Sequence, residues 1–474
     1  MQTAADAVAG ITFETDWLGS QPIFYNESSG KVSFTIDDVI DYTNLEFHPE
    51  GLNNYLDVGY SILGQTPVRN VKFAPPCSKI TKGVSGKLSI VRGPDVSEHH
   101  LNKISDEEEV FHKLQRAVRE WEHSFAGDFV LPLSGGYDSR LLALLVENKS
   151  RIRCFTYGVA DNQFRHSDVV YARRVAQTLN LKWKQIELGG FHKYVDDWIK
   201  LFGVSTHAHG MYQIEFFRKL VTEVPPGSRL LSGIIGDAWA GNVRIPEIRS
   251  PADVMKLGFS HGLNANSEAS VLSSKRELLE EYYEANKARL ASPLVRVIES
   301  MRFKMLLLSY LFTIPRTVGL VPWSPYLLPE FALPMLTIAA ERKKNRIWQQ
   351  DIFREHGLAV EQMQLKVKQE NSMALQATRR RPLPPLDPLI LREVISPAYV
   401  DWINRTIRPL RRSDLLWRVA RVKGIRGVLF RAGVSDQRTK AYNAYMTLKP
   451  IESLLQQRDR TSRGEAFAAA ENYN

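Results

Sequence analysis

Residues 129–140 read Phe129-Val130-Leu131-Pro132-Leu133-Ser134-Gly135-Gly136-Tyr137-Asp138-Ser139-Arg140. An apolar run ends here in two glycines, and leucines at helical spacing follow at once, which predicts a buried strand that turns sharply into a helix. The glycines allow a ligand to approach the backbone, and the first N–H groups of a helix have no partner within the helix. Because the helix dipole adds positive charge at the same place, this turn is expected to bind an anion.

The groups at this turn suit a pyrophosphate. Backbone N–H groups and the two serine hydroxyls can donate hydrogen bonds to phosphate oxygens, and the Asp138 carboxylate can hold a Mg²⁺ ion that bridges those oxygens. The expected cofactor-binding residues of the turn are Leu133, Ser134, Gly135, Gly136, Asp138 and Ser139. The spacing differs from the G-x-x-x-x-G-K-S/T loop, so the sequence does not indicate transfer of a γ-phosphoryl group.

The segments after the turn alternate between strand and helix patterns. Strands are predicted near residues 153–157, 183–188 and 229–232, with helices near 168–179 and 211–221 between them. Such alternation is typical of a parallel sheet wrapped by helices, with ligands at the carboxyl ends of the strands. The sequence therefore predicts an α/β fold in which the glycine turn lies at the ligand-binding edge.

The composition is that of a globular protein with a basic balance. The chain has 474 residues, 44% of them hydrophobic and 24% charged, which allows about two or three domains. Its two cysteines, Cys77 and Cys154, are far apart in sequence and support neither a disulfide framework nor a thiolate metal site. No secretory signal is visible at the N-terminus, so we expect a cytoplasmic protein. The net charge of +10 favours an anionic partner.

The order Ser-Gly-Gly-x-Asp-Ser at residues 134–139 resembles the pyrophosphate loop of the N-type ATP pyrophosphatases. The resemblance implies an adenine nucleotide α-hydrolase-like synthetase domain that cleaves ATP between its α and β phosphates. It implies ATP and Mg²⁺ as cofactors, and a carboxylate activated as its adenylate. Tyr157, at the end of the next predicted strand, matches the position whose backbone contacts the adenine in that family.

The N-terminal region has short strand-like segments separated by turn residues, which predicts a small, mostly β domain. Residues 16–25 resemble a run in the glutaminase domain of asparagine synthetases, and three segments between residues 51 and 76 resemble later parts of that family in the same order. A glutaminase of this class needs a cysteine after the initiator methionine as its nucleophile, and this chain has Gln2. We therefore expect a truncated class II glutamine amidotransferase remnant that packs against the second domain and does not hydrolyse glutamine.

A second apolar strand ends in small residues and an acid at residues 232–238. This run resembles the Ser-Gly-x-Gly-x-Asp-Glu segment of asparagine synthetases. The resemblance implies that Ser232 and Gly233 face the adenylate and that Asp237 helps Asp138 to hold magnesium. The chain departs from the family at three positions where family members carry an acid: Ile234, Ala238 and Leu328.

Two lysines occur where the family has an Arg-x-Lys motif whose lysine reaches the pyrophosphate. An ammonium group at that place can stabilise the negative charge that develops as the phosphoanhydride breaks. By this resemblance, Lys368 is the expected catalytic lysine, beside Asp138 and Asp237, and Lys366 is the nearby alternative.

The composition becomes basic towards the C-terminus. Residues 379–385 are arginine-rich and proline-rich, and residues 392–431 interleave arginines with apolar side chains. A basic amphipathic helix can lie on an anionic membrane surface or bind a polyanion, and packing on the chain's own domain is the alternative. The predicted parts are the glutaminase-like β domain at 1–105, the ATP-pyrophosphatase domain at 106–375 and the basic, partly helical region at 376–474.

Together these features predict an ATP-dependent ligase of the asparagine synthetase type. It would adenylate a carboxylate-bearing substrate, join it to an amine or ammonia, and release AMP and pyrophosphate, in the modification of a bacterial polysaccharide or a peptide natural product. The basic region favours an acidic polysaccharide and a place at the inner face of the membrane, and a nucleic acid is not the expected partner. Two alternatives stay open: an RNA-modifying ATP pyrophosphatase that acts on tRNA, and a non-catalytic nucleotide-binding scaffold.

Overall fold

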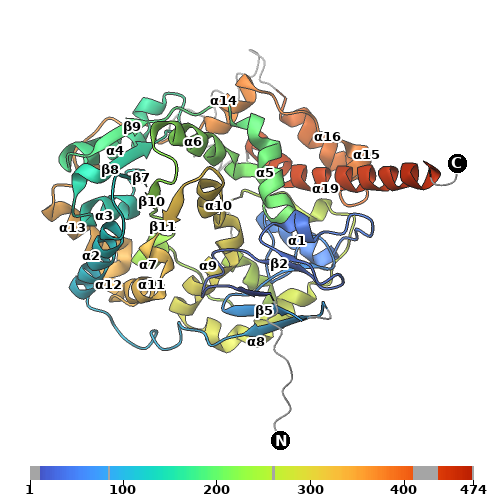
Figure 1. Cartoon of the computed structure of the whole chain (residues 1–474), viewed down its shortest axis with the longest axis horizontal. Coiled ribbons are helices and arrows are strands. Elements are labelled where there is room, and N and C mark those ends of the chain that lie inside the picture. The colour runs from blue at the N-terminus through green and yellow to red at the C-terminus, as the bar shows by residue number, and fades with distance from the viewer. Residues whose placement is uncertain (1–10, 84–85, 259–261, 409–435, 472–474) are drawn as a thin grey trace, which may run out of the picture.

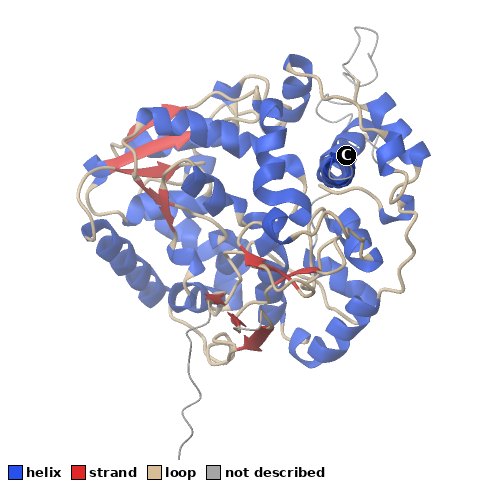
Figure 2. Cartoon of the chain, turned by 45° about the vertical axis from the view of Figure 1, so that its right-hand side comes forward, coloured by secondary structure: helices blue, strands red, loops and turns tan. Residues whose placement is uncertain are grey.

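The computed structural model describes residues 11–83, 86–258, 262–408 and 436–471. A five-stranded parallel sheet in the order β11-β10-β7-β8-β9 lies in the left half of Figure 1, with helices on both sides (Figures 1 and 2). The strands are β7 Phe129–Pro132, β8 Ile152–Thr156, β9 Lys182–Gln185, β10 Arg229–Leu231 and β11 Val321–Trp323. The predicted α/β fold, a parallel sheet wrapped by helices, is confirmed.

The α-helices of the described residues follow one another along the chain. They are α1 Pro49–Val58, α2 Glu107–His123, α3 Tyr137–Leu145, α4 Ser167–Thr178, α5 Val195–Phe202, α6 Tyr212–Leu220, α7 Gly236–Ala240, α8 Glu277–Leu290, α9 Pro293–Leu308, α10 Tyr310–Thr317, α11 Pro329–Leu336, α12 Ala340–Lys343, α13 Ile347–Glu355, α14 Met373–Arg380, α15 Pro388–Leu391, α16 Pro397–Thr406 and α19 Gln437–Glu471.

Strand β7 is apolar on both of its faces, because both faces are covered. Phe129 and Leu131 pack in one hydrophobic cluster with residues of α2 and α3. Val130 points the other way and belongs to a second cluster, which includes residues of α6 and α10. A strand buried on both faces reads as a continuous apolar run rather than as an alternating one. This burial fixes the position of the glycine turn that follows the strand.

The strand β11 was not among the strands that the sequence pattern predicts. It is only three residues long and contains Pro322, and a proline inside an apolar run argues against a central strand. In the structure β11 lies at the edge of the sheet and pairs only with β10, so the missing N–H of Pro322 is tolerated there.

The N-terminal region contains two small antiparallel sheets. One consists of β1 Thr12–Glu14, β5 Ser78–Lys82 and β6 Leu88–Arg92, and the other of β2 Phe24–Asn26, β3 Val32–Ser33 and β4 Val71–Phe73. The predicted small N-terminal β region is therefore present. The helix α1 joins these sheets to the rest of the molecule, since its Leu52 and Tyr55 are fully buried in the same hydrophobic cluster as Val130 of β7.

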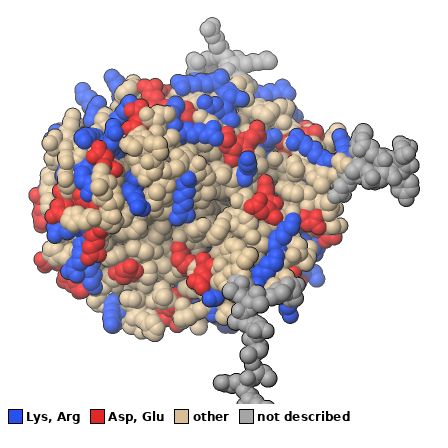
Figure 3. All heavy atoms as spheres, in the orientation of Figure 1, with Lys and Arg blue, Asp and Glu red and all other residues tan. Residues whose placement is uncertain are grey.

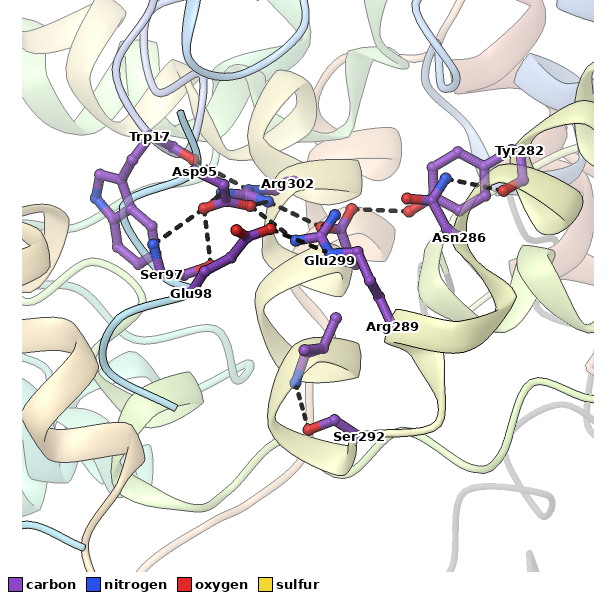
Figure 4. A network of polar contacts seen from close by, with 11 residues as sticks. Trp17, Asp95, Ser97, Glu98, Tyr282, Asn286, Arg289, Ser292, Glu299 and Arg302 are labelled. Atoms are coloured by element: carbon purple, nitrogen blue, oxygen red, sulfur yellow. Dashed lines mark hydrogen bonds and ion pairs between the residues drawn. The ribbon is translucent and has the colours of Figure 1, made fainter. Parts of the chain in front are cut away.

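A buried network of charged groups ties the N-terminal region to α9 (Figure 4). Arg302 of α9 donates hydrogen bonds to both carboxylate oxygens of Asp95, at 2.7 and 2.8 Å, and to Glu299, at 2.8 Å. Its Nε atom also donates to the backbone carbonyl of Trp17 at 3.0 Å. Although burial raises the pKa of Asp95, the hydrogen bonds and charge of Arg302 hold it well below its usual range. The network fixes α9 against the N-terminal segment.

The indole of Trp17 reaches the central sheet directly. Its ring lies 5.5 Å from the ring of Trp239 in α7, and its N–H donates to the carbonyl of Leu327 at 2.8 Å. Both tryptophans are buried. The N-terminal region thus packs against the two segments that follow β10 and β11.

The C-terminal helix α19 is part of the core rather than a free tail. Tyr445, Leu448 and Ile451 are fully buried in the cluster that also holds Val130 and Leu230. Residues 409–435, which include much of the stretch predicted to be a basic amphipathic helix, lie outside the described residues. The domain boundaries near residues 105 and 375 stay predictions.

Charges are mixed on the face of the molecule that Figure 3 shows. Basic and acidic side chains are interspersed there, and Lys and Arg are most frequent along the upper edge, where α14 lies in Figure 1. The helix α14 ends in Arg379 and Arg380. Within the described ranges, no helix combines the length and the apolar character that a membrane span requires.

Candidate active site

The glycine turn after β7 packs closely on α4. Gly135 has a φ of +71°, and a Cβ atom there would lie 2.6 Å from Cβ of Tyr171 and 2.8 Å from the backbone nitrogen of Ala172. Both the left-handed backbone and the lack of space therefore require glycine. The buried guanidinium of Arg140 stabilises the turn from the interior of the protein. It donates a hydrogen bond to the Gly135 carbonyl and pairs with Glu361 at 2.6 Å.

The two serines of the turn are oriented towards each other. Ser139 Oγ accepts a hydrogen bond from the backbone N–H of Ser134 at 3.2 Å, and the two hydroxyl oxygens lie 3.3 Å apart. The N–H of Gly136, the residue before α3, donates to Ser134 Oγ at 3.3 Å. Ser134 and Gly136 are exposed to solvent. The turn thus presents the Ser134 hydroxyl and the start of a helix to a ligand that approaches from outside, with the buried Ser139 hydroxyl directly behind Ser134.

The loop after β10 is held to the edge of the same sheet. The N–H of Ser232 donates to the carbonyl of Trp323 in β11 at 2.8 Å, which continues the pairing of these strands. Ile235 then adopts a left-handed backbone with a φ of 54°, and α7 starts at the next residue. This conformation is strained for a β-branched residue, and such strain is concentrated at functional sites.

Two glycines allow the loops after β7 and β10 to touch. A Cβ atom at Gly233 would lie 3.0 Å from the backbone nitrogen of Ser139, and one at Gly236 would lie 2.9 Å from Cγ of Asp138. The same Cβ atom at Gly236 would lie 2.8 Å from the ring of the buried Tyr326, so no side chain fits at this position. Asp237 follows Gly236 directly, so the two acids that are expected to hold magnesium come from two loops that are in contact.

The Asp138 carboxyl group occupies an unfavourable electrostatic position. Burial and the nearby Asp237 carboxylate raise the pKa of Asp138 to about 8, against the opposing effects of the Arg346 charge and a hydrogen bond from the Asp237 backbone N–H. Its Oδ1 atom is buried and has no hydrogen-bond partner. A bound cation would relieve both features, since it satisfies an oxygen atom and favours the ionised form.

These two carboxylates therefore fit a Mg²⁺ ion. The described part of the chain contains no cluster of three or more histidine, cysteine or acidic side chains that could hold a metal alone. Magnesium usually takes one or two carboxylates from the protein and the remaining oxygens from water and substrate phosphates. Asp138 and Asp237 supply that number. The Asp237 side chain is itself oriented by a hydrogen bond from Asn242 at 3.0 Å.

Two basic side chains that the sequence analysis did not identify lie beside the carboxylates. The guanidinium of Arg346, whose charge acts on Asp138, lies 4.1 Å from the centre of the Tyr137 ring. Lys304 of α9 is half-buried and interacts electrostatically with Asp237. No motif marks either position, because both reach the site only through the packing of segments that are distant in sequence from the two loops.

The predicted lysines lie at the margin of this site. The backbone of Lys368 pairs with residues 165–167 next to the start of α4: its N–H donates to Arg165 at 2.7 Å and its carbonyl accepts from Ser167 at 2.9 Å. The Lys368 ammonium lies 3.7 Å from Glu370 and is partly exposed. Lys366 is exposed. The structure thus brings the Lys368 segment to the helix that supports Gly135, and it pairs the side chain with Glu370 rather than with either aspartate.

The remaining predicted residue, Tyr157, follows β8 directly. Its hydroxyl accepts a hydrogen bond from Gln213 at 2.7 Å, and its ring packs 5.0 Å from the ring of Phe216. The side chain thus points into the core, which leaves only its backbone for contact with a ligand. Its predicted role as a backbone contact of adenine stays a prediction.

Comparison with known proteins gave one match to a family model. Residues 109–201 match the model described as Asparagine synthase. This segment contains β7, the glycine turn with Asp138, and the strands and helices as far as α5. It does not include Asp237 or Lys368. A search of curated proteins found no match.

Solved structures also include a similar chain, the NH3-dependent NAD synthetase from Campylobacter jejuni subsp. jejuni NCTC 11168 in complex with the nitrate ion. The match has 17% sequence identity and covers 53% of this chain and 96% of that chain, with a TM-score of 0.23. The family match places the glycine turn and Asp138 in a segment that is similar to asparagine synthases.

Proposed function

We propose that the protein is an ATP-dependent ligase that adenylates a carboxylate and joins it to an amine or to ammonia, with release of AMP and pyrophosphate. The observation that carries the proposal is the approach of Asp138 and Asp237 from two neighbouring parallel strands, with an unsatisfied oxygen on Asp138. Two acids at the carboxyl edge of a sheet, beside a turn that binds anions, suit a nucleotide that is cleaved within its phosphate chain.

In this proposal each group of the site has a defined task. Bound Mg²⁺ would supply positive charge to the phosphate oxygens. Asp138 and Asp237 would hold it, and the Ser134 and Ser139 hydroxyls would hold the pyrophosphate by hydrogen bonds.

Ser232 and Gly233 would face the adenylate, and the backbone of Tyr157 would contact the adenine. Lys368 would move from Glu370 to the leaving pyrophosphate, which its exposed position allows.

The N-terminal region would then serve as a support rather than as a source of ammonia. Trp17 contacts α7, the helix that contains Asp237, and Asp95 contacts α9, which packs against α7. Gln2, which occupies the place of the glutaminase cysteine, lies outside the described residues. Free ammonia, a separate subunit or an amine on a second substrate would supply the nitrogen.

The reaction products distinguish this proposal from other uses of ATP. The purified full chain is incubated with Mg²⁺, ATP and a panel of carboxylates, including uronic acids and polysaccharides built from them, with ammonium or simple amines. AMP and pyrophosphate that form only with an acid would support the ligase. ADP would contradict it.

Asp138→Asn tests the role of the acidic pair. We expect AMP formation to fall about 100-fold or more, because the variant cannot present a charged oxygen to the metal. Asp128→Asn is a matched control, since Asp128 lies just before β7 and makes only a 3.5 Å surface ion pair with Lys182. Equal turnover by both variants would remove Asp138 from the site.

The proposed acceptor is an acidic polysaccharide. The basic balance of the chain favours an acidic polysaccharide, made at the inner face of the membrane, over a neutral substrate. The tRNA alternative predicts AMP formation that depends on RNA, and a shift of RNA mobility with the protein. The scaffold alternative predicts nucleotide binding without turnover on any acid.

A further inference from the structure

Two basic side chains beside the acidic pair have no ionic partner. Among the residues that the structure describes, the side chains of Arg346 and Lys304 make no hydrogen bond and no close ion pair, although their charges act on Asp138 and Asp237. Most other basic groups near the sheet are paired, as Arg140 is with Glu361 and Arg342 with Glu107. An unpaired cation next to a ligand site is available to bind an anion.

A strained turn holds Arg346 over the glycine turn. Asn345 and Arg346 have φ values of 56° and 58°, so two successive residues other than glycine adopt the left-handed conformation before α13. Asparagine tolerates this conformation, but for arginine it is unfavourable and persists only where the surrounding structure imposes it. The guanidinium stacks on Tyr137, the residue between Gly136 and Asp138, at 4.1 Å. Stacking uses the face of the guanidinium and leaves the N–H groups at its edge free to donate.

Lys304 reaches the site from a different element. It lies on α9, which packs against α7, the helix that begins with Gly236 and Asp237. Burial lowers the pKa of Lys304, and the Asp237 charge opposes that effect. Two residues before it, Arg302 ties α9 to Asp95 and also pairs with Glu299 of the same helix (Figure 4), so the helix that carries Lys304 is fixed against the N-terminal region.

The site needs positive charge beyond one metal ion. The phosphate chain of ATP and the two carboxylates are all anionic, and a single Mg²⁺ offsets only part of that charge. Like charges that are close together in a partly buried site repel strongly. Arg346 stacks on Tyr137 next to Asp138, and Lys304 lies on α9, which packs against the helix that contains Asp237, so each acid has one cation whose charge acts on it.

We infer that Arg346 and Lys304 bind the β and γ phosphates of ATP, and the pyrophosphate that these phosphates become. The inference rests on the proposed function, since it assumes a nucleotide at the glycine turn. It assigns the phosphate end of the ligand to two residues outside the family motifs, and it leaves the AMP portion to other groups.

Binding measurements on the full chain test this inference without a known acceptor. The affinities for Mg²⁺ with pyrophosphate, Mg²⁺ with ATP, and AMP are measured by calorimetry for the unmodified protein and for Arg346→Gln and Lys304→Gln. We expect each substitution to weaken pyrophosphate and ATP binding by about tenfold or more, because a charge-assisted hydrogen bond is lost. AMP affinity should change by less than about twofold, because a ligand without β and γ phosphates does not use these contacts.

Control variants separate binding from folding. Lys287→Gln removes a lysine on the surface of α8 whose ion pair is with Glu284, and it should leave all three affinities unchanged. Arg346→Lys and Lys304→Arg keep the charge and should retain more of the pyrophosphate affinity than the glutamine variants. Thermal unfolding of every variant shows whether it is folded.

The outcomes are distinct. If the unmodified protein binds pyrophosphate and both glutamine variants bind it equally well, the inference is wrong and the proposed function is untouched. If AMP affinity falls as much as pyrophosphate affinity, these residues do not act at the phosphate end and the inference is also wrong. If the unmodified protein binds neither ATP nor pyrophosphate, the proposed function fails and this inference fails with it.

Discussion

Gly236 allows the Asp138 carboxyl group to lie against the start of α7, next to Asp237. The Asp138 carboxyl group and the Tyr326 ring both lie where a side chain at this position would be. A Cβ atom would lie within 3 Å of each of them. Gly236 is not among the glycines with positive φ, so this position requires glycine for space rather than for backbone conformation. The lack of a side chain here is what allows Asp138 to lie next to the start of α7.

We expect Gly236→Ala to weaken Mg²⁺-dependent ATP binding about tenfold or more, because the new methyl group displaces the Asp138 carboxyl group. The cost in stability should be about 1–3 kcal/mol, as for other overpacked sites. Calorimetric titration and urea unfolding measure the two effects. Gly464→Ala is the control, since a Cβ atom at Gly464 meets nothing within 4 Å. Unchanged ATP affinity in Gly236→Ala would show that the contact between the loops does not shape the site.

At the scale of elements, α9 connects the N-terminal region to the site. Arg302 of α9 donates a hydrogen bond to Asp95. The same helix packs against α7, which begins with Gly236 and Asp237. The side chains of Arg302, Asp95 and Glu299 are each less than one tenth exposed. A buried ion pair adds little net stability, but loss of Arg302 leaves the buried Asp95 and Glu299 with the partly exposed Arg289 as the one arginine that pairs with them in the described network.

Arg302→Met should therefore lower the free energy of unfolding by about 3–5 kcal/mol. Urea unfolding measures this loss, and the double variant Asp95→Asn with Arg302→Met should recover part of it because one unpaired charge is removed. Arg249→Met, which removes an exposed ion pair with Glu247, should cost less than about 1 kcal/mol. A similarly small loss for Arg302→Met would mean that the network is dispensable for the fold.

At the scale of the whole molecule, His192 joins three segments that are distant in sequence. Its Nδ1 atom lies 2.9 Å from the carbonyl oxygen of Arg381, and its Nε2 atom lies 3.0 Å from the hydroxyl of Tyr442 in α19. Burial is the main cause that lowers the pKa of His192 to about 4, from 6.5. The folded protein therefore holds this imidazole neutral at pH values where the unfolded chain binds a proton.

This shift predicts acid sensitivity with a defined sign. As pH falls from about 6.5 to about 4, the unfolded state takes up the proton first, so His192 should make the fold less stable by up to about 3 kcal/mol. Above pH 7 this effect should be absent. The difference in unfolding free energy between the natural protein and His192→Gln, measured by urea unfolding at several pH values, isolates the contribution of His192, because other titrating groups occur in both proteins. A difference that does not vary with pH in this range would contradict the prediction.

Local sequence patterns predicted the central fold well. The apolar run before the glycine turn gave β7, and strand and helix alternation after it gave β8, β9 and β10 with their helices. Such elements are determined by short-range periodicity, so one sequence suffices to find them. The strand β11 was not predicted, because it is short and contains Pro322, which is unusual inside a strand. Its pairing with β10 at the edge of the sheet is what identifies it as a strand.

The sequence by itself determined the glycine turn, the two acids at the ends of apolar strands and the parallel sheet that holds them, because spacing and residue type decide local structure. Only the tertiary structure decided that these acids meet, that Lys368 pairs with Glu370, and that Arg346 and Lys304 lie beside the acidic pair. Contacts between α9 and α7, and between the turn at Asn345 and Tyr137, join residues separated by tens to hundreds of positions. Burial and electrostatic interactions depend on distance in space rather than on distance in sequence. A local sequence pattern therefore does not predict which distant side chain will lie beside the two acids.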